Sequence, residues 1–108
     1  MNIAALEKML ARGKDDALLR FGLGNAYLQD GQASTAIVHL RAALEHKPDY
    51  SAAWKLLGKA YVEMQEPALA LQTYEDGIEA AEQAGDLQAA KEMNVFARRV
   101  RKSLDSPA

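Results

Sequence analysis

The chain has 108 residues, a formal net charge of −2 and no cysteine. This length predicts one domain, and the near balance of charge gives no whole-molecule field that would attract nucleic acid or a membrane. The lack of cysteine excludes disulfides and thiolate metal sites. The first residues are unlike a signal peptide, and no apolar stretch reaches the roughly 20 residues of a membrane-spanning helix, so we expect a cytoplasmic protein.

The first predicted helix covers about 2–12, where Ile3, Leu6 and Leu10 share one face. Adding 34 to each number, once and then twice, gives apolar residues again: Ile37, Leu40, Leu44, Leu71, Tyr74 and Ile78. The segment 1–14 is therefore predicted to be the second half of a helix–turn–helix unit whose first helix is missing.

Two helix hairpins are predicted next, in units 17–50 and 51–84, with helices at about 16–30, 34–47, 51–65 and 67–84. Asp15 and Asp49 precede the first helix of each unit and are expected to be N-caps, because their carboxylates can accept from unpaired backbone amides. Gly31 is expected to form the first turn, and Pro67 suits a first helical position.

The last predicted helix covers about 86–104, after a stop at Gly85 and an N-cap at Asp86. Lys91 and Glu92 stand where the preceding units have Leu-Gly. We interpret this helix as a cap that covers the open end of the array, and 105–108 as a tail.

The strongest pattern is a repeat, because Leu23-Gly24-x-x-Tyr27 returns as Leu57-Gly58-x-x-Tyr61 after 34 residues. A fixed period of this size predicts a solenoid, in which each unit buries its apolar face on the next. Gly24 and Gly58 lie mid-helix, where glycine costs roughly 1 kcal/mol relative to alanine. We therefore expect helices to cross closely there, opposite Ala36 and Ala70.

The run Trp54-x-x-Leu57-Gly58-x-x-Tyr61, followed by Ala70, resembles the tetratricopeptide repeat, a helix–turn–helix unit of 34 residues. The first unit departs from that pattern, since Arg20 stands where the family has Trp. The resemblance implies an all-α, right-handed α-solenoid of antiparallel helix hairpins with about six helices. It also implies a scaffold or adaptor that acts in protein–protein interaction and is not an enzyme.

In such an array the first helices of successive units line a concave face, and the register gives three rows. They are Phe21, Lys55 and Ala89, then Asn25, Lys59 and Met93, then Leu28, Val62 and Phe96. The predicted partner-binding residues are Phe21, Asn25, Leu28, Lys55, Lys59, Val62, Met93 and Phe96. A peptide with a carboxylate and an apolar anchor would suit this mixture.

An alternative interpretation makes Lys55 and Lys59 a solvated face and Phe96 part of the core of the capping helix. Some relatives hold a peptide's C-terminal carboxylate in a clamp of lysine, asparagine and further basic residues. Here Asn25 matches the clamp's asparagine, but Phe21 stands at the lysine position and Asp86 and Ala90 replace the basic residues, so no clamp is predicted. The alternative function of the protein is self-association, in which the exposed edge of the half-repeat stacks on another copy.

No constellation of residues indicates catalysis, and we expect no cofactor and no metal. His39 and His46 lie two helical turns apart, too far for an i,i+4 metal pair, and are interpreted as packing or surface residues. The basic cluster Arg98, Arg99, Arg101 and Lys102 is expected to interact with the C-terminal dipole of the last helix. Contact with an acidic partner or nucleic acid is the alternative for this cluster.

Overall fold

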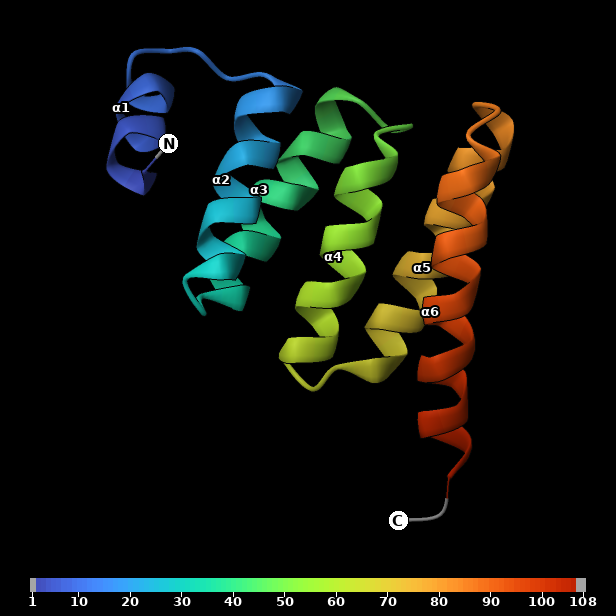
Figure 1. Cartoon of the computed structure of the whole chain (residues 1–108). Helices are drawn as coiled ribbons and strands as arrows, with labels where there is room; N and C mark the ends of the chain where they lie inside the picture. Colours follow the sequence, from blue (N-terminus) through green and yellow to red (C-terminus); the bar gives the residue numbers. More distant parts are fainter. Residues whose placement is uncertain (1, 107–108) are drawn as a thin grey trace.

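The computed structural model describes residues 2–106, and within them the chain forms six α-helices and no strand. The helices are α1 (Ile3–Ala11), α2 (Ala17–Gln29), α3 (Ala33–His46), α4 (Ser51–Glu63), α5 (Pro67–Gln83) and α6 (Leu87–Asp105). Helices α2, α4 and α6 form one row, and α3 and α5 form a second row behind it (Figure 1). The expected all-α solenoid of helix hairpins is confirmed.

The molecule is flat and elongated, with extents of 47 × 34 × 18 Å. Its radius of gyration is 14.1 Å, somewhat more than the ~13 Å expected of a compact domain of this length. This shape follows from stacking, because each helix contacts only its neighbours along the array.

The repeat glycines lie where two helices of one hairpin cross. A Cβ on Gly24 would stand 2.5 Å from Leu40 Cγ, and a Cβ on Gly58 would overlap the Tyr74 ring. Ala36 and Ala70 are fully buried on the opposing helices. The predicted close crossings are confirmed, and the side chains that fill the glycine notches are Leu40 and Tyr74.

The main core cluster runs from α2 to α6, and its largest fully buried side chains are Leu40 and Met93. Helix α1 packs on a separate, smaller cluster that contains Leu6, Leu19 and Leu23. The N-terminal half-repeat is thus held by less apolar contact than the two complete hairpins.

The predicted N-caps at Asp15 and Asp49 are wrong by one residue. The cap of α2 is Asp16, whose carboxylate accepts from the Leu19 amide at 2.8 Å, while Asp15 turns away to pair with Arg20. Helix α4 is preceded by Tyr50, which makes no side-chain cap. The N-cap position of α4 is Tyr50 and not Asp49, because the Tyr50 amide donates to the Lys47 carbonyl at 3.1 Å and closes a turn before the helix begins.

The other helix boundaries agree with prediction. Gly31 and Gly85 have φ of 76° and 80°, the left-handed conformation that ends a helix without a Cβ penalty. Pro67 begins α5, and Asp86 accepts from the Ala89 amide at 3.1 Å. Helix α6 includes Asp105, which the sequence predicts as part of the tail, and the predicted tail beyond 106 lies outside the described residues.

Candidate functional site

A groove runs between α4 and α6, with α5 beneath it, and has a volume of about 430 Å³. It exists because α4 and α6 are successive first helices, which stand side by side in the front row of the array (Figure 1). We call it the α4–α6 groove, and it is lined by Lys55, Leu56, Lys59, Val62, Tyr74, Glu92, Phe96, Arg99 and Val100.

The apolar part of the groove centres on two aromatic rings. Tyr74 is 4% exposed, and its ring centroid lies 5.6 Å from that of Phe96 at a tilt of 46°. Burial raises the pKa of Tyr74 to about 12, because the low-polarity surroundings disfavour the phenolate. Val62 beside them is 46% exposed and offers further apolar surface.

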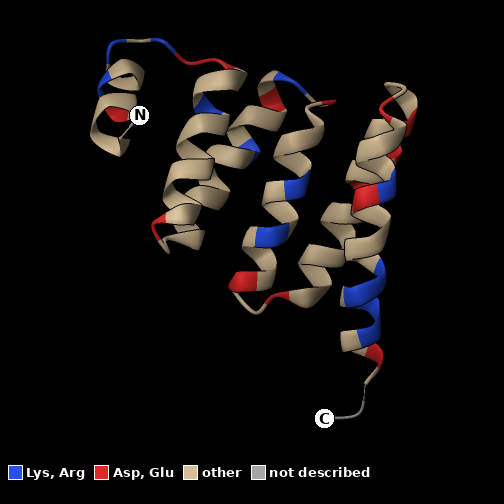
Figure 2. Cartoon of the chain, viewed as in Figure 1, with Lys and Arg blue, Asp and Glu red and all other residues tan. Residues whose placement is uncertain are grey.

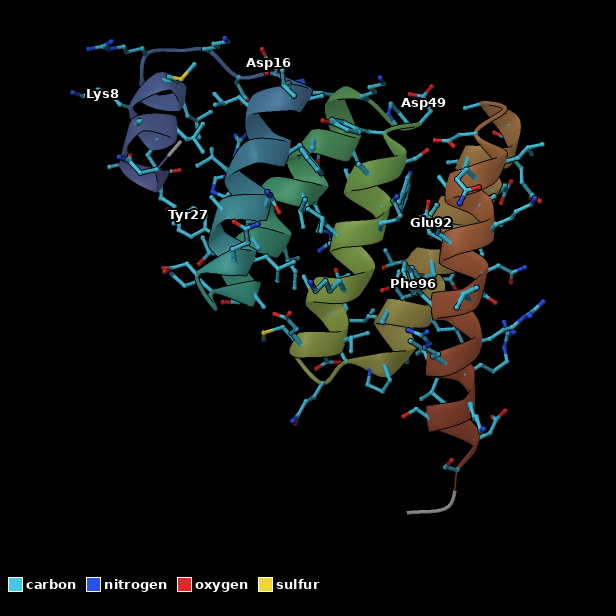
Figure 3. The ribbon with its side chains drawn as sticks, in the orientation of Figure 1. Lys8, Asp16, Tyr27, Asp49, Glu92 and Phe96 are labelled. Carbon is cyan, nitrogen blue, oxygen red and sulfur yellow. The ribbon has the colours of Figure 1, made fainter. Side chains whose placement is uncertain are left out.

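Three basic side chains, Lys55, Lys59 and Arg99, line the same groove as this apolar surface. Lys55 of α4 donates to Glu92 of α6 at 3.3 Å, which neutralises that lysine and ties the two helices together. Lys59 and Arg99 line the same groove, and neither has an ion-pair partner among residues 2–106. Figure 2 shows the basic residues of α4 and of the lower half of α6, and Figure 3 shows Glu92 and Phe96 on the side of α6 nearer α4.

Four of the eight predicted partner-binding residues line the α4–α6 groove together: Lys55, Lys59, Val62 and Phe96. Two others are core residues, since Leu28 is 6% exposed and Met93 is fully buried. Met93 packs against Gly77 of α5, where a Cβ would stand 2.7 Å from the Met93 sulfur. These two residues cannot contact a partner in this fold, which corrects the prediction.

The remaining two predicted residues lie elsewhere. The Phe21 ring stacks on Tyr50 with centroids 5.0 Å apart, so it supports the junction between the two complete hairpins. Asn25 lines a different hollow, beside α1. The groove is therefore narrower than the predicted three rows and lies at the C-terminal end of the array.

Sequence reasoning missed several residues of the groove, above all Tyr74 and Arg99. Tyr74 belongs to a second helix, yet it reaches the groove because Gly58 leaves room for its ring. The sequence prediction groups Arg99 with the basic cluster of α6. Its spacing of three residues from Phe96 is the signal that would have placed both on one side of that helix.

A polar network at the other end joins α1, α2 and α3. Arg20 donates to both oxygens of Asp15, at 2.8 and 3.0 Å, and approaches His39 Nδ1 at 3.0 Å. His46 lies 3.0 Å from Asp15, and Glu7 lies 3.7 Å from His39. Hydrogen bonds from Arg20 and His46 hold the pKa of Asp15 well below its usual value. Asp15 thereby connects the segment before α2 to both α2 and α3.

The described part of the chain contains no group of three or more His, Asp or Glu side chains that could hold a metal ion. Among the helices of residues 2–106, none has the length and apolar character needed to cross a membrane.

Comparison with known proteins decides the family. The family model described as tetratricopeptide repeat matches residues 27–93. The chain belongs to the tetratricopeptide repeat family. A TPR repeat-containing protein of Pseudomonas aeruginosa is 53% identical over 100 residues, which cover 93% of this chain and 95% of that protein.

Solved structures agree with this assignment. The solution structure of a protein from Bordetella parapertussis is 46% identical, with a TM-score of 0.83, and the match covers 94% of this chain and 88% of that one. The TPR2B domain of yeast Sti1, solved in complex with pHsp70, is 20% identical with a TM-score of 0.85, covering 94% and 81%. The second likeness establishes the fold alone. Repeats of this family commonly mediate protein–protein interaction.

Proposed function

We propose that this tetratricopeptide repeat protein binds a segment of a partner protein in the α4–α6 groove. The segment would place an apolar side chain on Tyr74 and Phe96 and a carboxylate between Lys59 and Arg99. The observation that supports this proposal is the pair of cations, Lys59 and Arg99, that line an apolar hollow and have no ion-pair partner among residues 2–106. Repeat proteins of this kind use such extended surfaces to hold partners.

We expect the apolar contact to supply most of the binding free energy and the charged groups to supply selectivity. Burying one large apolar side chain contributes about 1.5–3 kcal/mol, whereas an exposed ion pair contributes about 0.2–1 kcal/mol. The apolar contact would therefore supply most of the affinity. Lys59 and Arg99 would select acidic segments and speed their encounter, with binding that weakens as salt rises.

The test is peptide selection followed by calorimetry. Selection of displayed random peptides for binding to the intact protein is expected to enrich sequences that combine Asp or Glu with Leu, Phe or Trp. Arg99→Glu removes one favourable ion pair and adds a repulsion of similar size, so it should lower the affinity of an enriched peptide by about 2- to 30-fold. Its matched control is Arg98→Glu, because Arg98 is the preceding residue of α6, is exposed and does not line the groove.

A second pair of variants examines α4 in the same way. Lys59→Glu should lower the affinity for the peptide. Lys91→Glu changes an exposed lysine of α6 outside the groove and should leave that affinity unchanged. Equal affinity of the original protein, Arg99→Glu and Lys59→Glu for every enriched peptide would refute the proposal. Far-ultraviolet circular dichroism of each variant verifies that the helices are intact.

A further inference from the structure

A second hollow adjoins the α4–α6 groove at the turn between α4 and α5, and we call it the turn hollow. It has a volume of about 450 Å³ and is lined by Val62, Gln65, Pro67, Arg99, Val100 and Ser103. Three of these residues, Val62, Arg99 and Val100, also line the α4–α6 groove. The two hollows therefore meet at the Arg99 side chain, which has no ion-pair partner among residues 2–106.

The turn hollow follows the α4–α6 groove in the same direction along both of its walls. The lining residues run from Lys59 to Gln65 along α4 and its turn, and from Phe96 to Ser103 along α6. Helix α6 has 19 residues and α4 has 13, and the last turns of α6 continue past the α4–α5 turn (Figure 1). A segment bound in the groove would reach the turn hollow by continuing in that direction.

Gln65 holds a backbone conformation that the other turns of the array give to glycine. Its φ is 58°, and the other residues with positive φ in the described part of the chain are Gly13, Gly31 and Gly85. The turns at Gly31 and Gly85 make the same two backbone hydrogen bonds as the turn at Gln65, from the left-handed residue and from the residue after it. The turn itself is therefore better served by glycine, which avoids the strain of a Cβ. Strained residues of this kind concentrate at functional sites.

The turn hollow also offers polar groups without a partner. The Gln65 carboxamide and the Ser103 hydroxyl are exposed, and neither forms a hydrogen bond within residues 2–106. Each of these groups can both donate and accept. An extended peptide has unpaired amides and carbonyls that match them, whereas a helical segment satisfies its own backbone. The hollow therefore suits an extended segment.

From these observations we propose that the bound partner segment is extended and continues from the α4–α6 groove into the turn hollow. There the Gln65 side chain bonds the backbone of the segment, and a second apolar side chain lies on Val62 and Pro67. The carboxylate on Arg99 stands between the two apolar residues. This inference rests on the proposed function, because it concerns the same bound segment, and it makes Gln65 a residue that determines specificity.

The geometry of α6 gives the spacing of the two apolar residues. Phe96 and Ser103 are seven residues apart, which is about 10.5 Å along a helix. An extended chain advances about 3.3 Å per residue, so the two apolar side chains should be about three residues apart. Asp or Glu should lie between them. A helical segment would need about seven residues for the same span.

The experiment measures, by calorimetry, the dissociation constants of peptides selected on the intact protein. Gln65→Gly should raise the dissociation constant by about 2- to 12-fold, the effect of one lost hydrogen bond. The same variant should raise the midpoint of thermal unfolding, because glycine adopts the left-handed conformation without strain. The matched control is Met64→Ala, since Met64 precedes Gln65, is 43% exposed and lines neither hollow. It should leave the dissociation constant unchanged.

Changes in the peptide assign its two apolar residues to the two hollows. Alanine at one of these positions should abolish the difference between the original protein and Gln65→Gly, because the segment then leaves the turn hollow. Alanine at the other position should preserve that difference. Arg99→Glu should weaken both altered peptides, since the carboxylate is still present.

The outcomes separate this inference from the proposed function. If Arg99→Glu weakens the selected peptides but Gln65→Gly does not, the inference is wrong and the proposed function stands. Peptides with a single apolar residue, or with two about seven positions apart, would also overturn it. A lower thermal midpoint together with weaker binding in Gln65→Gly would show that Gln65 acts through the structure of the turn. If Arg99→Glu leaves every peptide unaffected, the proposed function and the inference both fail.

Discussion

Arg20 and Trp54 occupy the same repeat position, 34 residues apart, and each holds the turn that precedes its own helix. Arg20 does so through two hydrogen bonds to the Asp15 carboxylate, at 2.8 and 3.0 Å. Trp54 does so by donating its indole N–H to the Pro48 carbonyl at 2.8 Å. Arg20 therefore takes the structural role that tryptophan has at this repeat position, which is to hold the turn before the helix.

These two contacts should differ in strength. Arg20→Ala removes charge-assisted hydrogen bonds at a half-buried site and should lower the free energy of unfolding by about 1–2 kcal/mol. Trp54→Phe removes one neutral hydrogen bond and should cost about 1 kcal/mol. Urea unfolding followed by circular dichroism measures both. Arg12→Ala, at an exposed arginine, serves as the control, and an equal loss there would contradict the role of Arg20.

His39 makes the polar network that joins α1, α2 and α3 sensitive to pH. Its Nδ1 faces the Arg20 guanidinium at 3.0 Å, and because arginine only donates, Nδ1 must accept and the ring proton must lie on Nε2. The ring stacks on Tyr27 at an interplanar angle of 2°. Burial lowers the pKa of His39 below 6.5, against the attraction of Glu7 and Asp15 and with the repulsion of Arg20.

Acid should therefore weaken the fold between neutral pH and the folded-state pKa of His39. The unfolded chain binds a proton at the histidine near pH 6.5 while the folded chain does not, so stability falls as pH falls below that value. The free energy of unfolding, measured in urea from pH 7.5 to 5, should decline for the original chain and much less for His39→Asn. In His46→Asn the decline should persist, and its disappearance there would assign the effect to His46.

The 34-residue period predicted the first five helices, because it follows from the residues that every unit must bury. The sixth helix was predicted from the stop at Gly85 and the cap at Asp86, since the repeat pattern breaks at Lys91 and Glu92. The period did not predict the N-cap of α2, since the choice between Asp15 and Asp16 depends on Arg20, which draws Asp15 into a pair. It also placed Met93 in the groove. The register shows that a residue lies on a first helix, but Gly77 of α5 lets α6 settle deeply enough to bury that side chain.

Gly77→Ala should destabilise the protein. The added Cβ would stand 2.7 Å from Trp54 Cβ and 2.7 Å from the Met93 sulfur, and Trp54 Cβ cannot move without its backbone. Overpacking of this kind costs about 1–3 kcal/mol, more than the roughly 1 kcal/mol that alanine returns in helix propensity. Thermal unfolding should show a lower midpoint than the original chain. Gly22→Ala should show a higher one, because a Cβ on Gly22 of α2 would meet only the Leu6 methyl groups, at 3.9 and 4.0 Å. A raised midpoint for Gly77→Ala would mean that α4, α5 and α6 are less closely packed than described.

Tyr74 should make the fold sensitive to alkali. Burial raises its pKa from 10.0 to about 12, so the unfolded chain loses the phenolic proton at a lower pH than the folded chain does. The folded state binds more protons between these values, and stability therefore falls as pH rises through them. A difference of one pKa unit corresponds to about 1.4 kcal/mol, which is the expected contribution at pH 11. Tyr74→Phe should remove that part of the decline in urea unfolding between pH 9 and 11, leaving the smaller effect of Tyr50, whose pKa burial also raises. An identical decline in Tyr74→Phe and the original chain would show that the Tyr74 hydroxyl is in contact with water in the α4–α6 groove.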